Sequence, residues 1–580
     1  MFIRIMVLLY AVLASGCIAN TLNRPFVPAT KSDEVGERSD ENKRRGEIGR
    51  QVCENGSIGL CAIECKYDGG ETESSACNGD DKKKIYTLFI VEIDEQGRFY
   101  DDRQFHYLLD YLTKKEELQL CNGKMVKKGV SIVTIVHGWR HNATSDDPNV
   151  EDIRSILRTA YQSEEASSNL VCEGREIIGV YVGWRGKSMS LGLNWLEDPL
   201  ELLSFWERKN TAHNVAMGSV RELLSVLQQF VKHRDEYKEG RKKDDGTCTQ
   251  TIEVECKLDR LIIVGHSFGG LIVFNALSEG LLNSITSGMF KADVAHEGNE
   301  ENYPSKVRLN ADLVVLINPA IEGIRLEPIY QAIKRRDTYY GGKKGSGFNK
   351  YQSPVFITIT AKNDRATGRA FPWARGFSTI LEDKTPKSNR VLVDEKIIHL
   401  RDTELKRFIF DDEKRYSIMS KEESKANNHT MGHIPRYWTH KLSEVTSKNY
   451  QETISCLPKD QSAGRIRDWI QEFEFVSKQI RETYYKTSGE DSIYYCGDFK
   501  EKRSIEMSYL TKVLRQRDLK DEYESLPYNS PVWVIHSENR DILDGHSGYE
   551  VAKGRLVIPF IQMLYHQLIV SSKAPGAVPD

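Results

Sequence analysis

The chain has 580 residues, of which 28% are charged and 39% are hydrophobic, and its formal net charge is −3. This length allows a large core and more than one folded unit. Because a general nucleic-acid-binding protein carries a strong excess of positive charge, the composition predicts no nucleic-acid partner.

The N-terminus is typical of an exported protein. Residues 1–16 contain one basic residue, Arg4, and an apolar run from Ile5 to Leu13 that is too short to span a bilayer, so we interpret them as a signal peptide. Small residues directly precede Cys17, as in a bacterial lipobox, which makes Cys17 a candidate lipid anchor; an ordinary cleaved signal peptide is the alternative. We expect no membrane-spanning helix in the chain. The predicted location is the bacterial cell envelope, facing the periplasm or the exterior, or otherwise the secreted fraction.

The remaining cysteines indicate disulfides. Of eleven cysteines, ten are left when Cys17 is set aside, and an even number is typical of an exported, cross-linked chain. Proximity favours two bridges within residues 53–77, where a zinc cluster is the rival but lacks a C-x-x-C pair. Sequence does not fix the connectivity, and proximity favours these further pairs: Cys121 with Cys172, Cys248 with Cys256, and Cys456 with Cys496.

Two segments precede the expected globular core. Residues 17–52 are interpreted as the lipid-anchor cysteine and a flexible tether, because charges of both signs dominate residues 31–50 and no aromatic residue is present there to be buried. The cysteine-rich segment 53–83 is expected to be loop-rich. Globular structure is predicted to begin near residue 84.

Buried strands alternate with helical segments from residue 84 onward. This alternation predicts an α/β fold with a mostly parallel sheet flanked by helices, in which ligands bind beyond the carboxyl ends of the strands. The predicted strands are 85–93, 130–136, 177–183, 261–264, 313–317 and 355–360, and the predicted helices include 103–118, 150–161, 203–232 and 268–277.

Residues 381–528 break this alternation. They are rich in charged and aromatic residues, and one amphipathic helix is predicted with Ile466, Ile470, Phe473, Val476 and Ile480 on its apolar face. We interpret the range as a large helical insertion that acts as a cap, with a separate domain as the alternative. The strand pattern resumes at 532–535. The core is therefore divided into residues 84–380 and 529–572, with a tail at 573–580.

The stretch 258–277 carries the strongest functional signal. Its buried strand ends in Gly265-His266-Ser267-Phe268-Gly269, which fits G-x-S-x-G, and a helical pattern follows. On a strained strand-to-helix turn a serine hydroxyl is presented to a reacting carbonyl group, and glycines leave room for the crowded backbone. Ser267 is therefore the candidate nucleophile. A glycine-rich turn of any parallel α/β domain is the alternative.

A serine nucleophile needs a base beside it and an acid that orients the base. These residue types occur at the ends of successive predicted strands, in the order Ser267, Asp364, His546. Glu322, which follows the preceding strand, is the alternative acid. His433, inside the insertion, is the alternative base.

Further histidines and arginines lie near these strand ends. His440 falls within the insertion, and His536 falls within the last strand, where a core histidine is expected. Arg140, His141 and Arg185 either bind an anionic group of the substrate or pair with neighbouring carboxylates, and we favour pairing.

The chain resembles a bacterial esterase- or lipase-like α/β-hydrolase over about residues 84–380 and 529–572. The resemblance rests on six motifs: VHGWRHNA at 136–143, YVGWRG at 181–186, GHSFG at 265–269, INPA at 317–320, TAKND at 360–364 and DGHSGYE at 544–550. It implies a Ser-His-Asp triad of Ser267, His546 and Asp364, with the backbone N–H groups of Phe268 and Trp139 as oxyanion donors and no metal or organic cofactor.

The residues beside Trp139 are candidate substrate contacts: His137, Gly138 and Arg140. The implied activity is cleavage of carboxylic esters, with lipids as candidate substrates for a membrane-anchored enzyme. Acyl transfer or amide hydrolysis at the same site is one alternative. A non-catalytic envelope interaction protein on a hydrolase scaffold is the other.

Overall fold

The protein is described by a computed structural model, which divides into two compact units. Unit 1 comprises Met1–Cys248 and Glu255–Ala276, and unit 2 comprises Thr249–Val254 and Leu277–Asp580. The structure describes residues 22–24, 62–67, 83–113, 118–121, 124–139, 141–171, 175–184, 208–245, 259–287, 306–340, 346–348, 354–372, 390–393, 396–399, 428–444, 492–494, 508–512, 530–540 and 542–549, with the single residues 289, 352, 375, 426 and 526.

Unit 1 contains five neighbouring strands in the order β1-β2-β6-β5-β7. Strands β2, β6, β5 and β7 pair in parallel, and β1 pairs antiparallel with β2. All seven residues of β5 are buried, which is typical of a parallel strand covered on both faces. The strand bounds are β1 Ile63–Tyr67, β2 Lys84–Ile93, β5 Val130–Val136, β6 Glu176–Trp184 and β7 Arg260–His266.

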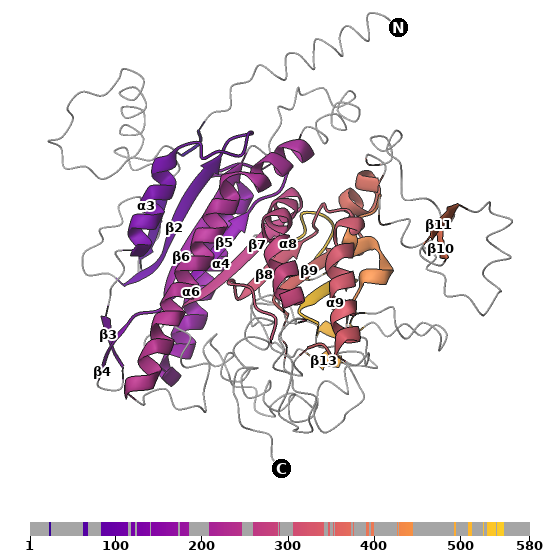
Figure 1. The fold of residues 1–580 in the computed structure, drawn as a ribbon. Helices are drawn as coiled ribbons and strands as arrows, with labels where there is room; N and C mark the ends of the chain where they lie inside the picture. Colours follow the sequence, from indigo (N-terminus) through magenta and orange to yellow (C-terminus); the bar gives the residue numbers. More distant parts are fainter. Residues whose placement is uncertain are drawn as a thin grey trace, which may run out of the picture. The chain divides into compact units, whose positions relative to one another are not determined.

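Three helices of unit 1 lie against these strands (Figure 1). Helix α3 (Asp102–Thr113) contacts β2, α4 (Pro148–Val171) contacts β2 and β6, and α6 (Ser219–Asp245) contacts β7. A separate hairpin joins β3 (Leu118–Cys121) to β4 (Lys124–Lys127). Helix α8 (Phe268–Ser287) follows β7 after a single residue.

Unit 2 contains six neighbouring strands in the order β8-β9-β15-β12-β14-β13. The first four pair in parallel, and β14 and β13 continue antiparallel. Helix α9 covers Glu327–Tyr339, and β10 (Arg390–Val393) and β11 (Lys396–His399) form a separate hairpin. The strand bounds are β8 Leu313–Ile317, β9 Phe356–Ala361, β12 His440–Glu444, β13 Ser492–Tyr494, β14 Ser508–Lys512 and β15 Val532–Ser537.

These elements confirm the α/β class, with mostly parallel strands and flanking helices. Two local predictions differ from the structure. The segment predicted to be loop-rich contains β1, and the helix expected over 103–118 ends at Thr113, with residue 118 already in a strand. Within 381–528 the described residues form strands and short 3-10 turns, whereas the helix predicted through 466–480 lies outside the described residues.

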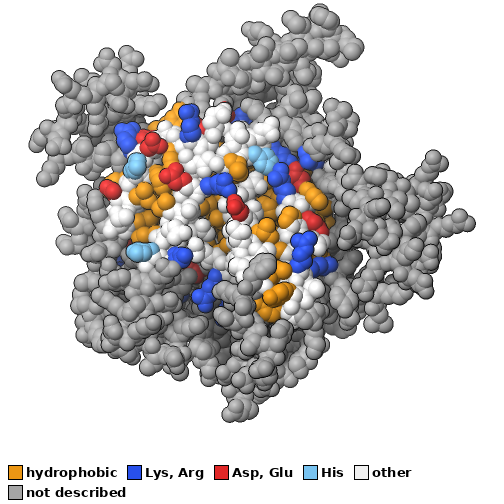
Figure 2. Space-filling model, viewed as in Figure 1, with side chains coloured by type: hydrophobic (Ala, Val, Ile, Leu, Met, Phe, Trp, Pro, Cys, Tyr) orange, Lys and Arg blue, Asp and Glu red, His pale blue; other side chains and the backbone are white. Residues whose placement is uncertain are grey.

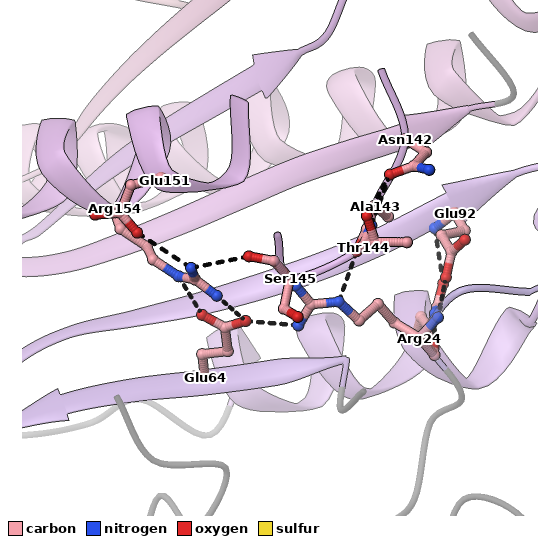
Figure 3. Close-up of polar contacts among 10 residues, drawn as sticks. Arg24, Glu64, Glu92, Asn142, Ala143, Thr144, Ser145, Glu151 and Arg154 are labelled. Carbon is pink, nitrogen blue, oxygen red and sulfur yellow. Dashed lines mark hydrogen bonds and ion pairs between the residues drawn. The ribbon is translucent and has the colours of Figure 1, made fainter. Parts of the chain in front are cut away.

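Residues 22–24, within the predicted tether, are fastened to unit 1 by buried charges (Figure 3). Arg24 is fully buried; its side chain donates to Ala143 O at 2.6 Å and to Glu64 Oε1 at 2.5 Å. Arg154 of α4 donates two hydrogen bonds of 2.9 Å to the Glu64 carboxylate, and Glu92 of β2 accepts from the backbone N–H of Arg24. Because an unpaired buried charge is very costly, this part of the segment belongs to the folded unit.

Helix α8 is the one helix among the described residues that is long and apolar enough to cross a membrane by length and composition. Of its most apolar 18-residue window, 56% is buried inside the protein, as in a core helix. On the face seen in Figure 2, basic and acidic side chains of the described residues are interspersed, which agrees with the small net charge.

Candidate functional site

Ser267 occupies the turn between β7 and α8. β7 ends at His266 and α8 begins at Phe268, so Ser267 alone makes the turn. Its φ is +53°, and Asn318 is the only other non-glycine residue of the described chain with a positive φ. A serine in this backbone region is strained by about 1–2 kcal/mol, and such strain clusters at functional sites. Ser267 is 3% exposed.

Glycines allow the turn to pack against the end of β5. A Cβ atom on Gly269 would overlap the carbonyl oxygens of Val136 and His137. On Gly138 it would lie 3.0 Å from the Cβ of Ser267. The loop after β5 therefore lies directly beside the candidate nucleophile.

His137 holds this loop in place from within the core. Its ring is fully buried and stacks on Tyr181 and Trp184. Because the backbone N–H of Trp184 donates to Nε2 at 3.0 Å, the proton of the neutral ring is on Nδ1, which donates to Gly138 O at 2.8 Å. Burial lowers the pKa of His137 to about 4, so the ring is neutral at pH 7. This placement favours a positioning role over the predicted contact with substrate.

The bond to Gly138 also sets the direction of the next N–H group. In a trans peptide the C=O and N–H groups point in opposite directions. The N–H of Trp139 therefore points away from His137. The N–H of Phe268 lies in the first turn of α8, before the first helical bond from Leu271 N to Ser267 O. The rings of Trp139 and Phe268 lie 6.3 Å apart, so both predicted oxyanion donors belong to one region of unit 1.

Asp364, in unit 2, lies just beyond β9 and is 3% exposed. Its Oδ1 accepts from the N–H groups of Ala366 (2.9 Å) and Thr367 (3.1 Å). Its Oδ2 accepts from the hydroxyl of Thr367 and from Nδ1 of His546, the latter at 2.9 Å. Burial raises the pKa of Asp364, but the bonds to His546 and Thr367 outweigh burial and leave the pKa below its ordinary value. The carboxylate is therefore ionised.

His546 is oriented by Asp364 and by two asparagines. Since a carboxylate only accepts, Nδ1 of His546 carries a proton and, in the neutral ring, Nε2 carries the lone pair of a base. The side chain is 24% exposed. Asn318 Nδ2 donates to the carbonyls of Gly545 (2.9 Å) and His546 (2.8 Å), and Asn363 Oδ1 accepts from Gly545 N at 2.8 Å. These bonds fix the loop that carries the imidazole.

The alternative acid and base have other partners. Glu322 is 1% exposed and pairs with Arg325 at 3.1 Å and Arg375 at 3.2 Å. His433 Nε2 lies 3.0 Å from Thr367 Oγ1. His536 lies within β15, as expected for a core histidine, and its ring stacks on Trp438 at 3.9 Å.

Several other predicted residues can also be placed. His141 Nδ1 pairs with Asp147 at 2.9 Å, as favoured from the sequence, and Cys121 ends β3. The following predicted residues lie outside the described residues: Cys17, Arg140, Cys172, Arg185, Cys248, Cys256, Cys456 and Cys496.

Three supporting residues were missed by sequence reasoning: Asn318, Asn363 and Thr367. Weak signals existed, because Asn318 follows a predicted strand in INPA and Asn363 directly precedes Asp364. Comparisons with protein-family models, curated proteins and solved structures found no match. The candidate residues thus lie in two local arrangements: a strained serine turn in unit 1 and an ionised aspartate–histidine pair in unit 2.

Proposed function

We propose that the protein is a serine hydrolase of the α/β-hydrolase type that cleaves carboxylic esters. The observation that carries the proposal is the positive φ of Ser267 at a strand-to-helix turn. Such a turn places a nucleophile beyond the carboxyl end of a strand, and its backbone conformation is rarely adopted by a residue with a side chain. The Asp364–His546 pair supplies the acid and base that such a serine requires.

In the proposed mechanism Ser267 Oγ attacks the ester carbonyl carbon while its proton passes to His546 Nε2. The N–H groups of Phe268 and Trp139 stabilise the oxyanion, and Asp364 stabilises the imidazolium. His546 then protonates the departing alkoxide, which leaves an acyl group on Ser267. Water, deprotonated by His546, releases the acid and restores the serine.

The proposed setting is the bacterial envelope, with Cys17 lipidated and with membrane lipids as one class of ester substrate. The support is the short apolar segment ahead of Cys17. Metabolic labelling with a palmitate analogue tests this step: label is expected on the wild-type chain and lost in Cys17→Ser. Equal labelling of the two would contradict the proposed anchor.

The experiment that tests the chemistry is labelling with a fluorophosphonate probe, followed by mass spectrometry of the modified peptide. We expect modification at Ser267, its absence in Ser267→Ala, and a rate at least a hundredfold lower in His546→Ala. His106→Ala is the matched control, since His106 is an exposed histidine on α3. A folded wild-type protein that is never modified, or is modified equally fast in His546→Ala, would contradict the proposal.

A further inference from the structure

A chain of hydrogen bonds extends behind the aspartate of the candidate site. The Thr367 hydroxyl contacts both Asp364 Oδ2 and His433 Nε2, the latter at 3.0 Å. A hydroxyl has one proton, and an ionised carboxylate only accepts. The Thr367 proton is therefore donated to Asp364, and Thr367 Oγ1 accepts from His433. Nε2 of His433 must then carry a proton.

All donors in this chain point toward one carboxylate. His433 donates to Thr367, Thr367 donates to Asp364, and His546 donates to the same oxygen of Asp364. Hydrogen bonds that are aligned in this way polarise and strengthen one another in a low-dielectric interior. In this arrangement the Asp364 carboxylate can only accept hydrogen bonds. As an acceptor it orients His546.

The donor at the end of this chain comes from the range 381–528 and is firmly held. Gly432, beside His433, packs so closely on β9 that a Cβ atom there would overlap the side chain of Thr360. Met431 N donates to Ile321 O at 3.0 Å, and the indole of Trp438 donates to Gly432 O at 2.8 Å. The backbone that carries the His433 ring is thereby held against β9.

His433 is also kept neutral. Burial lowers its pKa, the neighbouring His429 and His546 lower it further, and Asp364 acts in the opposite direction. A neutral ring does not compete with His546 for the charge of Asp364.

We propose that His433 is a positioning residue, which acts through Thr367 to hold Asp364 as the acceptor that orients His546. In this view the range 381–528 contributes a positioning residue to the acid–base pair. The consequence for Ser267 rests on the proposed function, whereas the effect on the Asp364–His546 hydrogen bond does not.

The test uses the full chain and two pairs of variants. Thr367→Val removes the hydroxyl and keeps the shape, whereas Thr367→Ser keeps the hydroxyl. His433→Phe removes the donor, whereas His433→Gln places an amide N–H near the position of Nε2. The first readout is the low-field proton NMR signal of the His546 Nδ1–H, assigned by its loss in His546→Ala. The second is the rate of fluorophosphonate labelling at Ser267.

We expect Thr367→Val and His433→Phe to shift the NMR signal upfield and to slow labelling. The rate should fall roughly ten- to a hundredfold in Thr367→Val, which loses a hydrogen bond to a charged group, and about two- to tenfold in His433→Phe, which loses one between neutral groups. Thr367→Ser and His433→Gln are expected to restore both readouts. If Thr367→Val and His433→Phe unfold the chain, Thr367→Ser and His433→Gln still test the proposal, because each of these must keep the wild-type NMR signal. An unshifted signal in Thr367→Val or His433→Phe, or an equal loss in all four variants, would overturn it. Wild-type protein that shows the signal but is not labelled would refute the proposed function alone.

Discussion

The two units fix their candidate catalytic residues by different means. In unit 1 the backbone places Ser267, through a positive φ and close contacts at Gly138 and Gly269. In unit 2 side-chain hydrogen bonds place Asp364 and His546. Residues placed by close backbone contacts should be disturbed by a substitution that adds an atom. Residues placed by side-chain hydrogen bonds should be disturbed by a substitution that removes a donor. Substitutions at Gly269, Asn318 and His137 test this contrast, and acidification probes the buried core of each unit; the expected effects run from the largest to the smallest.

Gly269→Ala should be the most damaging of these changes. The new methyl group would overlap two carbonyl oxygens of the β5 end, so we expect a loss of about 3 kcal/mol or more in the free energy of unfolding. Gly280→Ala is the matched control on the same helix, because nothing lies within 4 Å of its Cβ position. That substitution should stabilise the protein by about 0.5–1 kcal/mol. Urea unfolding of both variants measures the difference, and a similar effect in the two would contradict the contrast.

Lowering the pH should reduce the stability of each folded unit, because each contains a buried histidine with a lowered pKa. Burial lowers the pKa of His137 in unit 1 and of His536 in unit 2 to about 4. Below the ordinary histidine pKa of about 6.5 the unfolded chain takes up protons that the folded chain refuses, so stability falls as the pH drops toward 4, by about 3 kcal/mol per histidine.

Hydrogen exchange from pH 7 to pH 4 measures this loss in each unit. His137→Gln should flatten the pH dependence of unit 1 only, and His536→Gln that of unit 2 only. A pH dependence unchanged by either substitution would show that these rings are not the cause.

Substitutions of Asn318 test the side-chain hydrogen bonds of unit 2. Its amide donates to the two carbonyls of the His546 loop, and its Oδ1 accepts from Ala361 N at 2.9 Å. Asn318→Gly keeps a residue suited to φ +44° but leaves buried groups without partners, so we expect a loss of about 2 kcal/mol. Asn318→Ala should lose about 1 kcal/mol more, because alanine disfavours positive φ. Thermal unfolding measures the stability of both variants. A loss of stability in Asn318→Ala alone would show that the backbone conformation of Asn318, and not its side-chain hydrogen bonds, is what matters.

Two substitutions of His137 can distinguish the two hydrogen bonds that its ring makes. Asn at this position can keep the donor to Gly138 O, and Gln can keep an acceptor for Trp184 N. If the Gly138 bond directs the Trp139 N–H, labelling of Ser267 should stay near wild type in His137→Asn and fall about tenfold in His137→Gln. The reverse order would show that the Trp184 bond is the one that matters.

The contrast also explains which features the sequence could predict. The serine turn was predictable because its chemistry lies in five consecutive residues after an apolar strand. Asp364 and His546 were predictable as polar residues beyond strands. Their supports were not, because the bonds depend on packing between distant segments: Asn318 and His546 are 228 positions apart, and Thr367 and His433 are 66 apart. Strand β1 was missed since its segment is dominated by small polar residues.

The central claim is that Ser267 and His546 work together, and a thiol at position 267 tests it most directly. In Ser267→Cys the pH dependence of alkylation at this position reports the pKa of the thiol. A helix N-terminus and a neighbouring imidazolium both lower a thiol pKa from its ordinary value of about 8.5. We predict a pKa well below that value in Ser267→Cys and a clear rise toward it when His546→Ala is added. The same thiol pKa in both proteins would contradict the account.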